Sequence, residues 1–207
     1  MPIIKQVDSE INDTEKRLNA RDFPGLLEQL ESNDPSARRW AARDLATHSE
    51  AAKALVQRLK REDDKSVGEA ILTTLTKLAD PVAVACLVEC LRSEDVALRN
   101  EVIEAMKNLP NEVAPIMGSL LTDTDPDVRI FAVNILESLR HPQVETWLME
   151  VIKNDTHVNV CATALDLLGE VGTLASLDAL QNLKLKFSDQ PYIIFAADLA
   201  IKRISEA

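Results

Sequence analysis

The sequence predicts an all-α fold, an α-solenoid (superhelix) of about six helix pairs, and three observations lead to this prediction. First, good helix formers dominate the composition, whereas aromatic residues make up only 3% and there are only 5 glycines. This argues against a sandwich or barrel with many tight turns. Second, one sequence pattern recurs about every 30 residues. Third, each copy is accompanied by two segments whose apolar residues have helical spacing.

Five copies of one pattern follow one another along the chain. They begin at Asp34, Asp64, Asp95, Asp125 and Asn154 and end at Leu45, Leu75, Met106, Leu136 and Leu165. The end positions are separated by 30, 31, 30 and 29 residues, and a sixth, degenerate copy runs through 193–201. A unit of this length cannot bury its apolar face alone, so neighbouring copies are expected to stack around a continuous core.

Each copy predicts the second helix of a pair. In the third copy, the apolar residues Leu98, Val102, Ala105, Met106 and Leu109 form one stripe at 100° per residue. A segment with similar spacing precedes every copy and predicts the first helix. These segments span 26–30, 55–59, 87–91, 116–121, 147–152 and 177–183. The turn between the helices carries Asp or Asn, which are good N-caps, and proline often follows, where a missing N–H costs little.

The two ends of the array are less regular. Residues 1–21 have apolar residues at helical spacing among many polar ones, and we interpret them as an N-terminal capping helix or arm. The repeat array then spans 22–207. The last segment, 193–204, is apolar on more than one face. Either the final repeat closes against its own first helix, or it offers a surface for self-association, so we expect a monomer or a weak homodimer.

The turn Asp, the Arg that follows it and the closing Leu resemble the HEAT repeat, here in about six HEAT-like helix pairs. The period near 30 is similar to the short, phycobilisome-lyase-like variety, and the resemblance covers roughly 22–205. It implies a structural ladder of turn Asp and helix Arg residues between stacked repeats. The matching residues are Asp34, Arg38, Asp95, Arg99, Asp125 and Arg129. Gly68 replaces the Arg in the second copy and Val158 in the fifth, so we expect the ladder to be interrupted there.

Motifs for catalysis or metal binding are not found in the sequence. It contains no HExxH, CxxC, glycine-rich phosphate loop or GxSxG. HEAT-like deoxyhypusine hydroxylases hold iron through repeated His-Glu pairs, but none of the three histidines here is followed by Glu. Cys86 and Cys90 lie one helical turn apart without further ligands at metal spacing, and we interpret them as small core residues. We therefore expect no enzyme activity, no catalytic residue, no metal and no cofactor.

The net charge of −11 bears on the partner. It disfavours nucleic acid, which is bound through Lys and Arg, and the negatively charged face of a membrane. A basic or amphipathic protein is the more plausible partner. The three cysteines are an odd, unpatterned set, and no signal sequence or membrane span is recognised, so we expect a cytoplasmic protein.

Partner-binding residues are expected where the second helices face away from their apolar stripe, since the HEAT resemblance implies that these helices line the concave side. The candidates are Arg39, Trp40, Arg43, Asn100, Glu101, Glu104, Ile130, Phe131 and Asn134. Ile130 stands in a mostly polar row, and Trp40 and Phe131 are of the type that anchors interfaces. Alternatively, both rings fold over neighbouring helices and plug the stack, and the polar residues form a solvated face.

Three functions remain open at this stage. The preferred one is a non-catalytic scaffold or adaptor that binds a partner helix or peptide on the concave surface. The second is a lyase-like or maturation accessory protein that acts on a cofactor-bearing client, which rests on the short repeat type alone. The third is a structural subunit that needs its own copy or a larger assembly to cover its ends.

Overall fold

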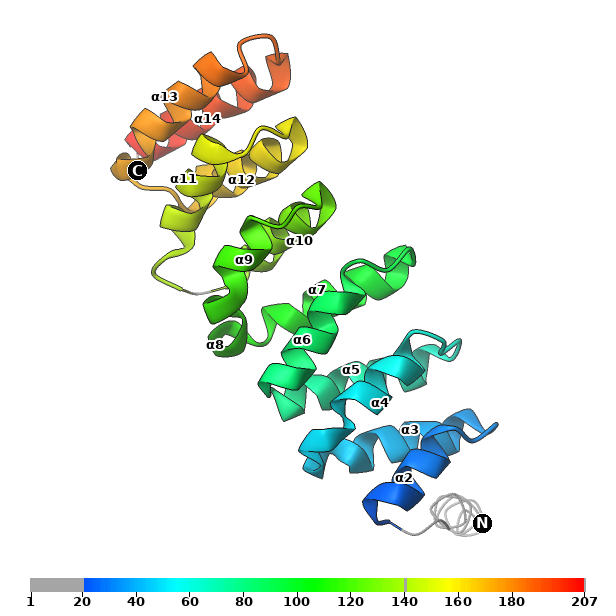
Figure 1. Cartoon of the computed structure of the whole chain (residues 1–207). Coiled ribbons are helices and arrows are strands. Elements are labelled where there is room, and N and C mark those ends of the chain that lie inside the picture. Colours follow the sequence, from blue (N-terminus) through cyan, green and yellow to red (C-terminus); the bar gives the residue numbers. More distant parts are fainter. Residues whose placement is uncertain (1–20, 140, 207) are drawn as a thin grey trace, which may run out of the picture. The chain divides into compact units, whose positions relative to one another are not determined.

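The computed structural model describes residues 21–139 and 141–206, and the regular secondary structure within these ranges is helical. The described helices form six consecutive pairs, which confirms the predicted α-solenoid (Figure 1). None of them is long and apolar enough to cross a membrane. The predicted capping helix or arm, residues 1–21, lies outside the described residues except for Arg21.

The chain divides into two compact units, with the boundary after Ala105, and each unit is described by itself. The α-helices of unit 1 are α2 (Phe23–Leu30), α3 (Pro35–Asp44), α4 (Ala52–Leu59), α5 (Lys65–Leu78), α6 (Pro81–Cys90) and most of α7 (Val96–Lys107). Two 3₁₀ turns, Leu45–Thr47 and Ser49–Ala51, connect α3 to α4. In each pair the even-numbered helix is the first and the odd-numbered helix the second.

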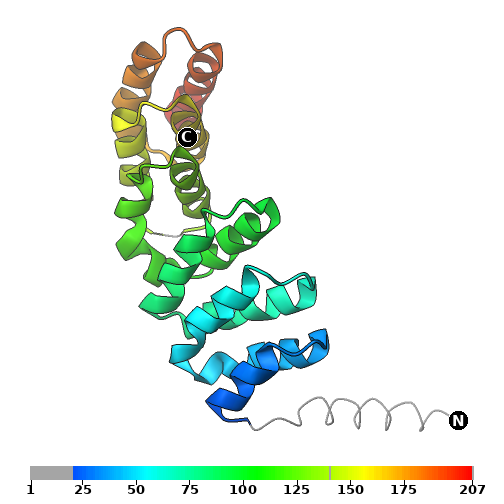
Figure 2. The same ribbon diagram turned by 45° about the vertical axis from the view of Figure 1, so that its right-hand side comes forward.

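Unit 2 contains the other three pairs. Its helices are α8 (Pro110–Val113), α9 (Met117–Leu121), α10 (Pro126–Leu136), α11 (Val144–Asn154), α12 (Val158–Val171), α13 (Leu177–Lys186) and α14 (Pro191–Glu206). The second helices are α10, α12 and α14, and Figure 2 shows them as one layer beside the layer of α9, α11 and α13. The predicted pairing is therefore present in both units.

The second helices begin where the sequence pattern predicts. Asp34 and Asp125 each accept a hydrogen bond at 2.9 Å from the backbone N–H two residues further on. Asp64 and Asp95 make the same kind of bond at the starts of α5 and α7. These bonds satisfy N–H groups that have no partner within the helix, so the turn aspartates fix the helix starts.

Second helices also pack against one another. In unit 1, α3 lies along α5, and the buried Thr74 hydroxyl donates to the Ala42 carbonyl at 2.8 Å. In unit 2, α12 lies between α10 and α14 and contacts both. The side of each second helix that is turned away from its first helix and from its neighbours stays open to solvent.

The fifth repeat corrects the sequence alignment. Asn154 is the last residue of α11, and α12 begins at Val158 with His157 in the N-cap position. The fifth copy thus begins three residues later than the alignment placed it. The first apolar residue of its buried stripe is Val160, not His157. The N-caps Asp125 and His157 are 32 residues apart, against 30 or 31 between the earlier N-caps, and an alignment without gaps cannot detect this longer spacing.

The last repeat closes against its own first helix, one of the two alternatives above. The inner stripe of α14, formed by Ile193, Ala197, Ala200 and Ile204, is buried, and α13 packs along α14. The opposite side of α14 is nevertheless apolar and exposed, and it is described with the candidate site.

Ala79 is the one described non-glycine residue with a left-handed backbone, with φ 48° and ψ 23°, and it ends α5. Its Cβ makes this conformation cost about 1–2 kcal/mol, whereas glycine adopts it freely but adds about 0.4–1 kcal/mol of unfolded-state entropy. We expect Ala79→Gly to raise the free energy of unfolding by about 0.5–1 kcal/mol, measured by urea denaturation. Ala85→Gly, on the exposed side of α6, is the control and should lower it by about 1 kcal/mol. A loss of stability in both variants would contradict the backbone argument.

Candidate partner-binding surface

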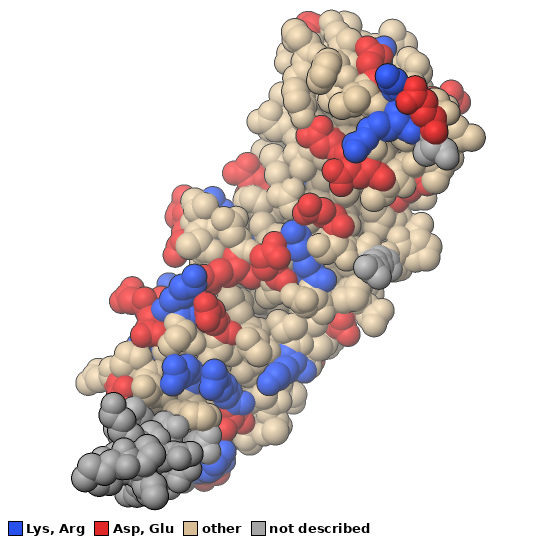
Figure 3. Space-filling view, turned by 180° about the vertical axis from the view of Figure 1, so that it is seen from behind, with Lys and Arg blue, Asp and Glu red and all other residues tan. Residues whose placement is uncertain are grey.

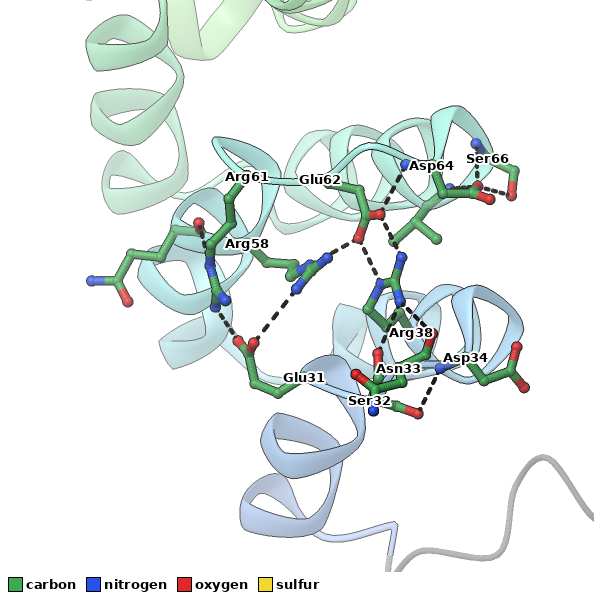
Figure 4. Close-up of polar contacts among 12 residues, drawn as sticks. Glu31, Ser32, Asn33, Asp34, Arg38, Arg58, Arg61, Glu62, Asp64 and Ser66 are labelled. Carbon is green, nitrogen blue, oxygen red and sulfur yellow. Dashed lines mark hydrogen bonds and ion pairs between the residues drawn. The ribbon is translucent and has the colours of Figure 1, made fainter.

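A buried ion pair holds the first two repeats of unit 1 in register (Figure 4). Arg38 on α3 donates from Nε to Glu62 Oε2 at 2.7 Å and from Nη2 to Glu62 Oε1 at 2.6 Å. Glu62 lies in the turn before α5, and the two side chains are only 9% and 1% exposed. Arg38 Nη1 also donates to the carbonyl of Ser32 at 2.9 Å. A paired, bidentate contact of this kind is strong and geometrically selective.

Neighbouring arginines extend this pair to the first helices. Arg58 Nε donates to Glu62 Oε2 at 2.8 Å, and both Arg58 and Arg61 form ion pairs with Glu31. Burial acts to raise the pKa of Glu62, but the hydrogen bonds from Arg38 and Arg58 outweigh it and lower this pKa to about 2. Glu62 is therefore ionised at neutral pH and works as a structural anion.

The predicted ladder residues have two separate roles. The aspartates cap their own helices, as described above, and the carboxylate partners of Arg38 and Arg129 stand in the turn of the next repeat. In unit 2, Arg129 donates to Asp155 from Nε at 2.6 Å and from Nη2 at 3.1 Å, just as Arg38 donates to Glu62. Arg99 donates to the carbonyl of Ser93, which matches the bond from Arg38 to Ser32. Both acceptor carboxylates precede the N-cap of the following helix by two residues.

The ladder has no arginine at Gly68, as expected, and in the fifth repeat the residue at that position is Cys161, not Val158. The Cys161 thiol donates to the carbonyl of Asp155, six residues earlier, as the arginines do in their own repeats. Lys186 of α13 supplies the positive charge, since its Nζ donates to the carbonyls of Ile152 and Lys153 at 3.1 Å and to that of Asp155. A lysine of the sixth repeat thus caps the end of α11.

Glu145 on α11 holds the turn that leads to the sixth repeat. Its carboxylate accepts from Thr173 N at 2.7 Å, from Thr173 Oγ1 at 2.9 Å and from the buried Ser176 hydroxyl. Burial acts to raise the pKa of Glu145, but these hydrogen bonds from Ser176 and Thr173 lower it. Glu62 and Glu145, the carboxylates with a lowered pKa described so far, are thus both bound by residues that hold the repeats together.

The candidates Arg39, Trp40 and Arg43 lie together on α3 in unit 1. Arg43 is exposed, and its guanidinium carbon lies 5.4 Å from the centroid of the Trp40 ring, a cation–π distance. Trp40 and Arg39 are half-buried. At the position of Trp40, α5 carries the buried Ala70, so this row lies at the border between surface and core.

The candidates Asn100, Glu101 and Glu104 lie on α7, also in unit 1. Asn100 and Glu104 are exposed and Glu101 is half-buried. They present amide and carboxylate groups but no apolar anchor. The structure thus gives unit 1 an aromatic and basic face on α3 and an acidic, polar face on α7.

The remaining candidates, Ile130, Phe131 and Asn134, lie together on α10 in unit 2, and all three are half-buried. The side of α10 that carries them is turned away from α9. Figure 3 views the second helices from this side. Near the C-terminal helices it shows an area of uncharged side chains with both acidic and basic side chains along its border.

The largest exposed apolar side chains of this layer were not among the sequence candidates. On α14, Tyr192, Phe195 and Leu199 are 55%, 69% and 48% exposed and follow one another at helical spacing. Pro191 begins α14 as Pro126 begins α10, so Phe195 matches Ile130 and Leu199 matches Asn134 in the same rows. Anchoring the degenerate sixth copy on Pro191 would have revealed these positions from the sequence.

A shallow hollow of about 170 Å³ lies between α10 and α12, next to these rows. It is lined by Val133, Asn134, Glu137, Thr163, Asp166, Leu167 and Glu170. Asp166 connects the hollow to α14, since the Tyr192 hydroxyl donates to its two carboxylate oxygens at 2.7 and 2.8 Å. This hydrogen bond is the main cause of the raised pKa of Tyr192. The lining contains three carboxylates and no lysine or arginine.

The stacked helix pairs, the buried inter-repeat ion pairs and the open faces of the second helices define an α-solenoid of the repeat-protein class. The chain belongs to the HEAT-repeat family, whose model matches residues 23–107 and 114–193. No curated protein matches the sequence.

Solved structures are similar to the chain at low sequence identity. The chain is similar to the tumor overexpressed gene (TOG) domain arrays of microtubule polymerases, with 11% identity, a TM-score of 0.56, and coverage of 95% of this chain and 51% of that chain. It is also similar to the archaeal HEAT-like repeats protein from Thermococcus onnurineus NA1, with 16% identity, a TM-score of 0.47, and coverage of 87% and 86%. A third similar structure is the complex of CpcE and CpcF of phycocyanin lyase from Nostoc sp. PCC7120, with 19% identity and a TM-score of 0.35. The match covers 87% of this chain and 94% of that chain.

Proposed function

We propose that the chain is a non-catalytic protein-interaction scaffold whose partner binds the exposed faces of the second helices. The observation that carries this proposal is the row of large, exposed apolar side chains on α14, in register with Ile130 and Phe131 on α10. Exposed aromatic and leucine side chains that lie side by side are typical of interaction sites. The fold itself supports a role in protein interaction, because the stacked helices present extended binding surfaces.

The titratable groups support a non-catalytic role. The lowered pKa values of Glu62, Glu145 and Asp155 are each explained by a hydrogen-bonded partner that joins two repeats. Burial raises the pKa of the cysteine thiols, to about 11 for Cys161, so they stay protonated and are poor nucleophiles. These groups serve the packing of the repeats.

A pull-down from extract of the source cells tests the proposal. The immobilised protein is compared with Trp40→Ala, with the double variant Ile130→Ser and Phe131→Ser, and with the double variant Phe195→Ser and Leu199→Ser. Because hot-spot residues each contribute about 2 kcal/mol or more, at least one variant should lose a bound protein by about 30-fold. Circular dichroism and thermal melting establish that each variant is folded.

Two results would contradict the proposal. If folded variants of all three faces keep every partner, the second-helix faces are not the binding surface. If the purified protein carries a pigment absorbance, the lyase-like accessory role is favoured instead.

A further inference from the structure

The outer face of α14 is unusual because this helix is apolar on two opposite sides. Its inner stripe is buried, while Tyr192, Phe195 and Leu199 follow the outer side at positions i, i+3 and i+7. Such a stripe is the pattern that a helix uses to bury one face against another helix. In the described part of unit 2, no element covers it, since each of these side chains is about half exposed or more.

The apolar surface continues from α14 across α12 to α10. At the matching positions α12 has the small, half-buried residues Ala162 and Thr163, and α10 has Ile130 and Phe131. We call this surface of α14, α12 and α10 the band. Packed helices lie about 8–10 Å apart, so the band measures roughly 20 Å across the three helices. A helix of about 14 residues, with a rise of 1.5 Å per residue, spans this length.

Charge is distributed unevenly along the band and indicates what can cover it. Beside α10 and α12, the hollow described above presents Glu137, Asp166 and Glu170. Lys107 donates to Glu137 at 3.1 Å and Tyr192 to Asp166, but a carboxylate has about four acceptor sites and can accept further bonds. The corresponding end of α14 carries Lys202 and Arg203 instead. A complementary segment is therefore basic over α10 and α12 and apolar over α14.

We propose that the outer face of α14 docks an amphipathic helix of a partner protein, with the basic flank of that helix at the acidic hollow between α10 and α12. This inference rests on the proposed function and adds the chemistry of the partner and its place in unit 2. Phe195 and Leu199 supply the apolar anchors, and the hollow admits one lysine or arginine side chain. Its volume of about 170 Å³ corresponds to several water molecules at about 30 Å³ each.

Fluorescence anisotropy with labelled synthetic peptides tests the proposal on the full chain. The probe is an amphipathic peptide of about 14 residues with leucines on one face and lysines on one flank at one end. It is compared with the same peptide carrying glutamates in place of the lysines, and with a scrambled peptide of the same composition. We expect the basic amphipathic peptide to bind, and the acidic one to bind at least about 10-fold more weakly, with a difference that shrinks at high salt.

Variants locate the binding site. Phe195→Ser with Leu199→Ser should weaken binding of the basic peptide by about 30-fold, and Asp166→Asn with Glu170→Gln by about 5- to 10-fold. Leu185→Ser is the matched control, since Leu185 is 76% exposed on α13 and should leave the affinity unchanged. The exposure of Phe195 and Leu199 means that their replacement leaves the fold intact, which circular dichroism verifies.

Four outcomes would overturn the inference. The scrambled peptide could bind as well as the amphipathic one, or the α14 variant could behave like the Leu185→Ser control. Light scattering could instead reveal a dimer that the α14 variant abolishes, and the occupant would then be a second copy of the chain. If the peptides fail but Trp40→Ala loses partners in the pull-down, the scaffold function stands and only this inference falls.

Discussion

Replacing Arg38 by alanine should lower the free energy of unfolding by about 3–5 kcal/mol, the largest effect that we expect from a single substitution in this protein. The change leaves Glu62, whose side chain is 1% exposed, with only the Arg58 guanidinium as a cationic partner. An ion left buried without its partner costs several kcal/mol, far more than the loss of a surface ion pair. Urea denaturation measures the difference.

Arg61→Ala is the matched control, because Arg61 belongs to the same group of charges but is 55% exposed in its contact with Glu31. Exposed ion pairs contribute about 0–1 kcal/mol, so this variant should unfold almost like the wild type. Equal losses in the two variants would mean that the buried pair does not hold the first two repeats together.

The dependence on pH gives a second readout of the same contact. The pKa of Glu62 is lowered from 4.5 to about 2 in the folded protein, so its ionised form is stabilised by folding. This contribution, about 2 kcal/mol after screening by solvent is allowed for, is complete above pH 4.5 and is lost as the pH falls through 2. The difference between wild type and Arg38→Ala should therefore shrink as the pH falls from 4.5 towards 2.

Gly172→Ala should destabilise the protein by about 3 kcal/mol, at the upper end of the cost of overpacking. A Cβ at this position would lie 2.5 Å from the backbone oxygen of Leu168, 2.9 Å from Ile204 Cδ1 and 3.1 Å from Ser176 Oγ. The backbone oxygen cannot move without breaking the end of α12, where Gly172 N donates to that same oxygen at 2.8 Å. The last helix would then be displaced from the fifth repeat.

Gly118→Ala provides the comparison for this effect. A Cβ at Gly118, within α9, meets no atom within 4 Å. Alanine favours a helix over glycine by about 0.8–1 kcal/mol, so this variant should gain stability. Thermal melting of both variants tests the argument, and a neutral Gly172→Ala would show that the turn relaxes without cost.

The sequence predicted most of the fold because its determinants are local. Asp34, Asp64, Asp95 and Asp125 cap the helices that follow them, and a cap acts within a few residues of its own position. The helical spacing of apolar residues likewise records which side of each helix is buried. The helix pairs were therefore predictable, except that a longer spacing between the N-caps Asp125 and His157 displaced the start of α12.

The candidate surface was only partly predictable. Ile130 was found because it interrupts a polar row, and Phe131 because aromatic residues often anchor interfaces; both lie on the open layer of unit 2. Phe195 and Leu199 were missed, since a stripe of apolar residues on a terminal helix predicts burial as readily as exposure. Whether such a stripe is covered depends on which elements pack beside it, and a helical period does not contain that information.

The arrangement of charges divides in the same way. The sequence by itself determined that arginines recur at one position of the repeat, among them Arg38 and Arg129. Only the tertiary structure decided that their partners are Glu62 and Asp155 in the turn of the next repeat. It also decided that Lys186 supplies the positive charge in the fifth repeat, where Cys161 stands in place of the arginine. The reason is physical: a cap or an apolar stripe is specified within one helix, whereas an ion pair between repeats depends on the distance at which two helix pairs stack.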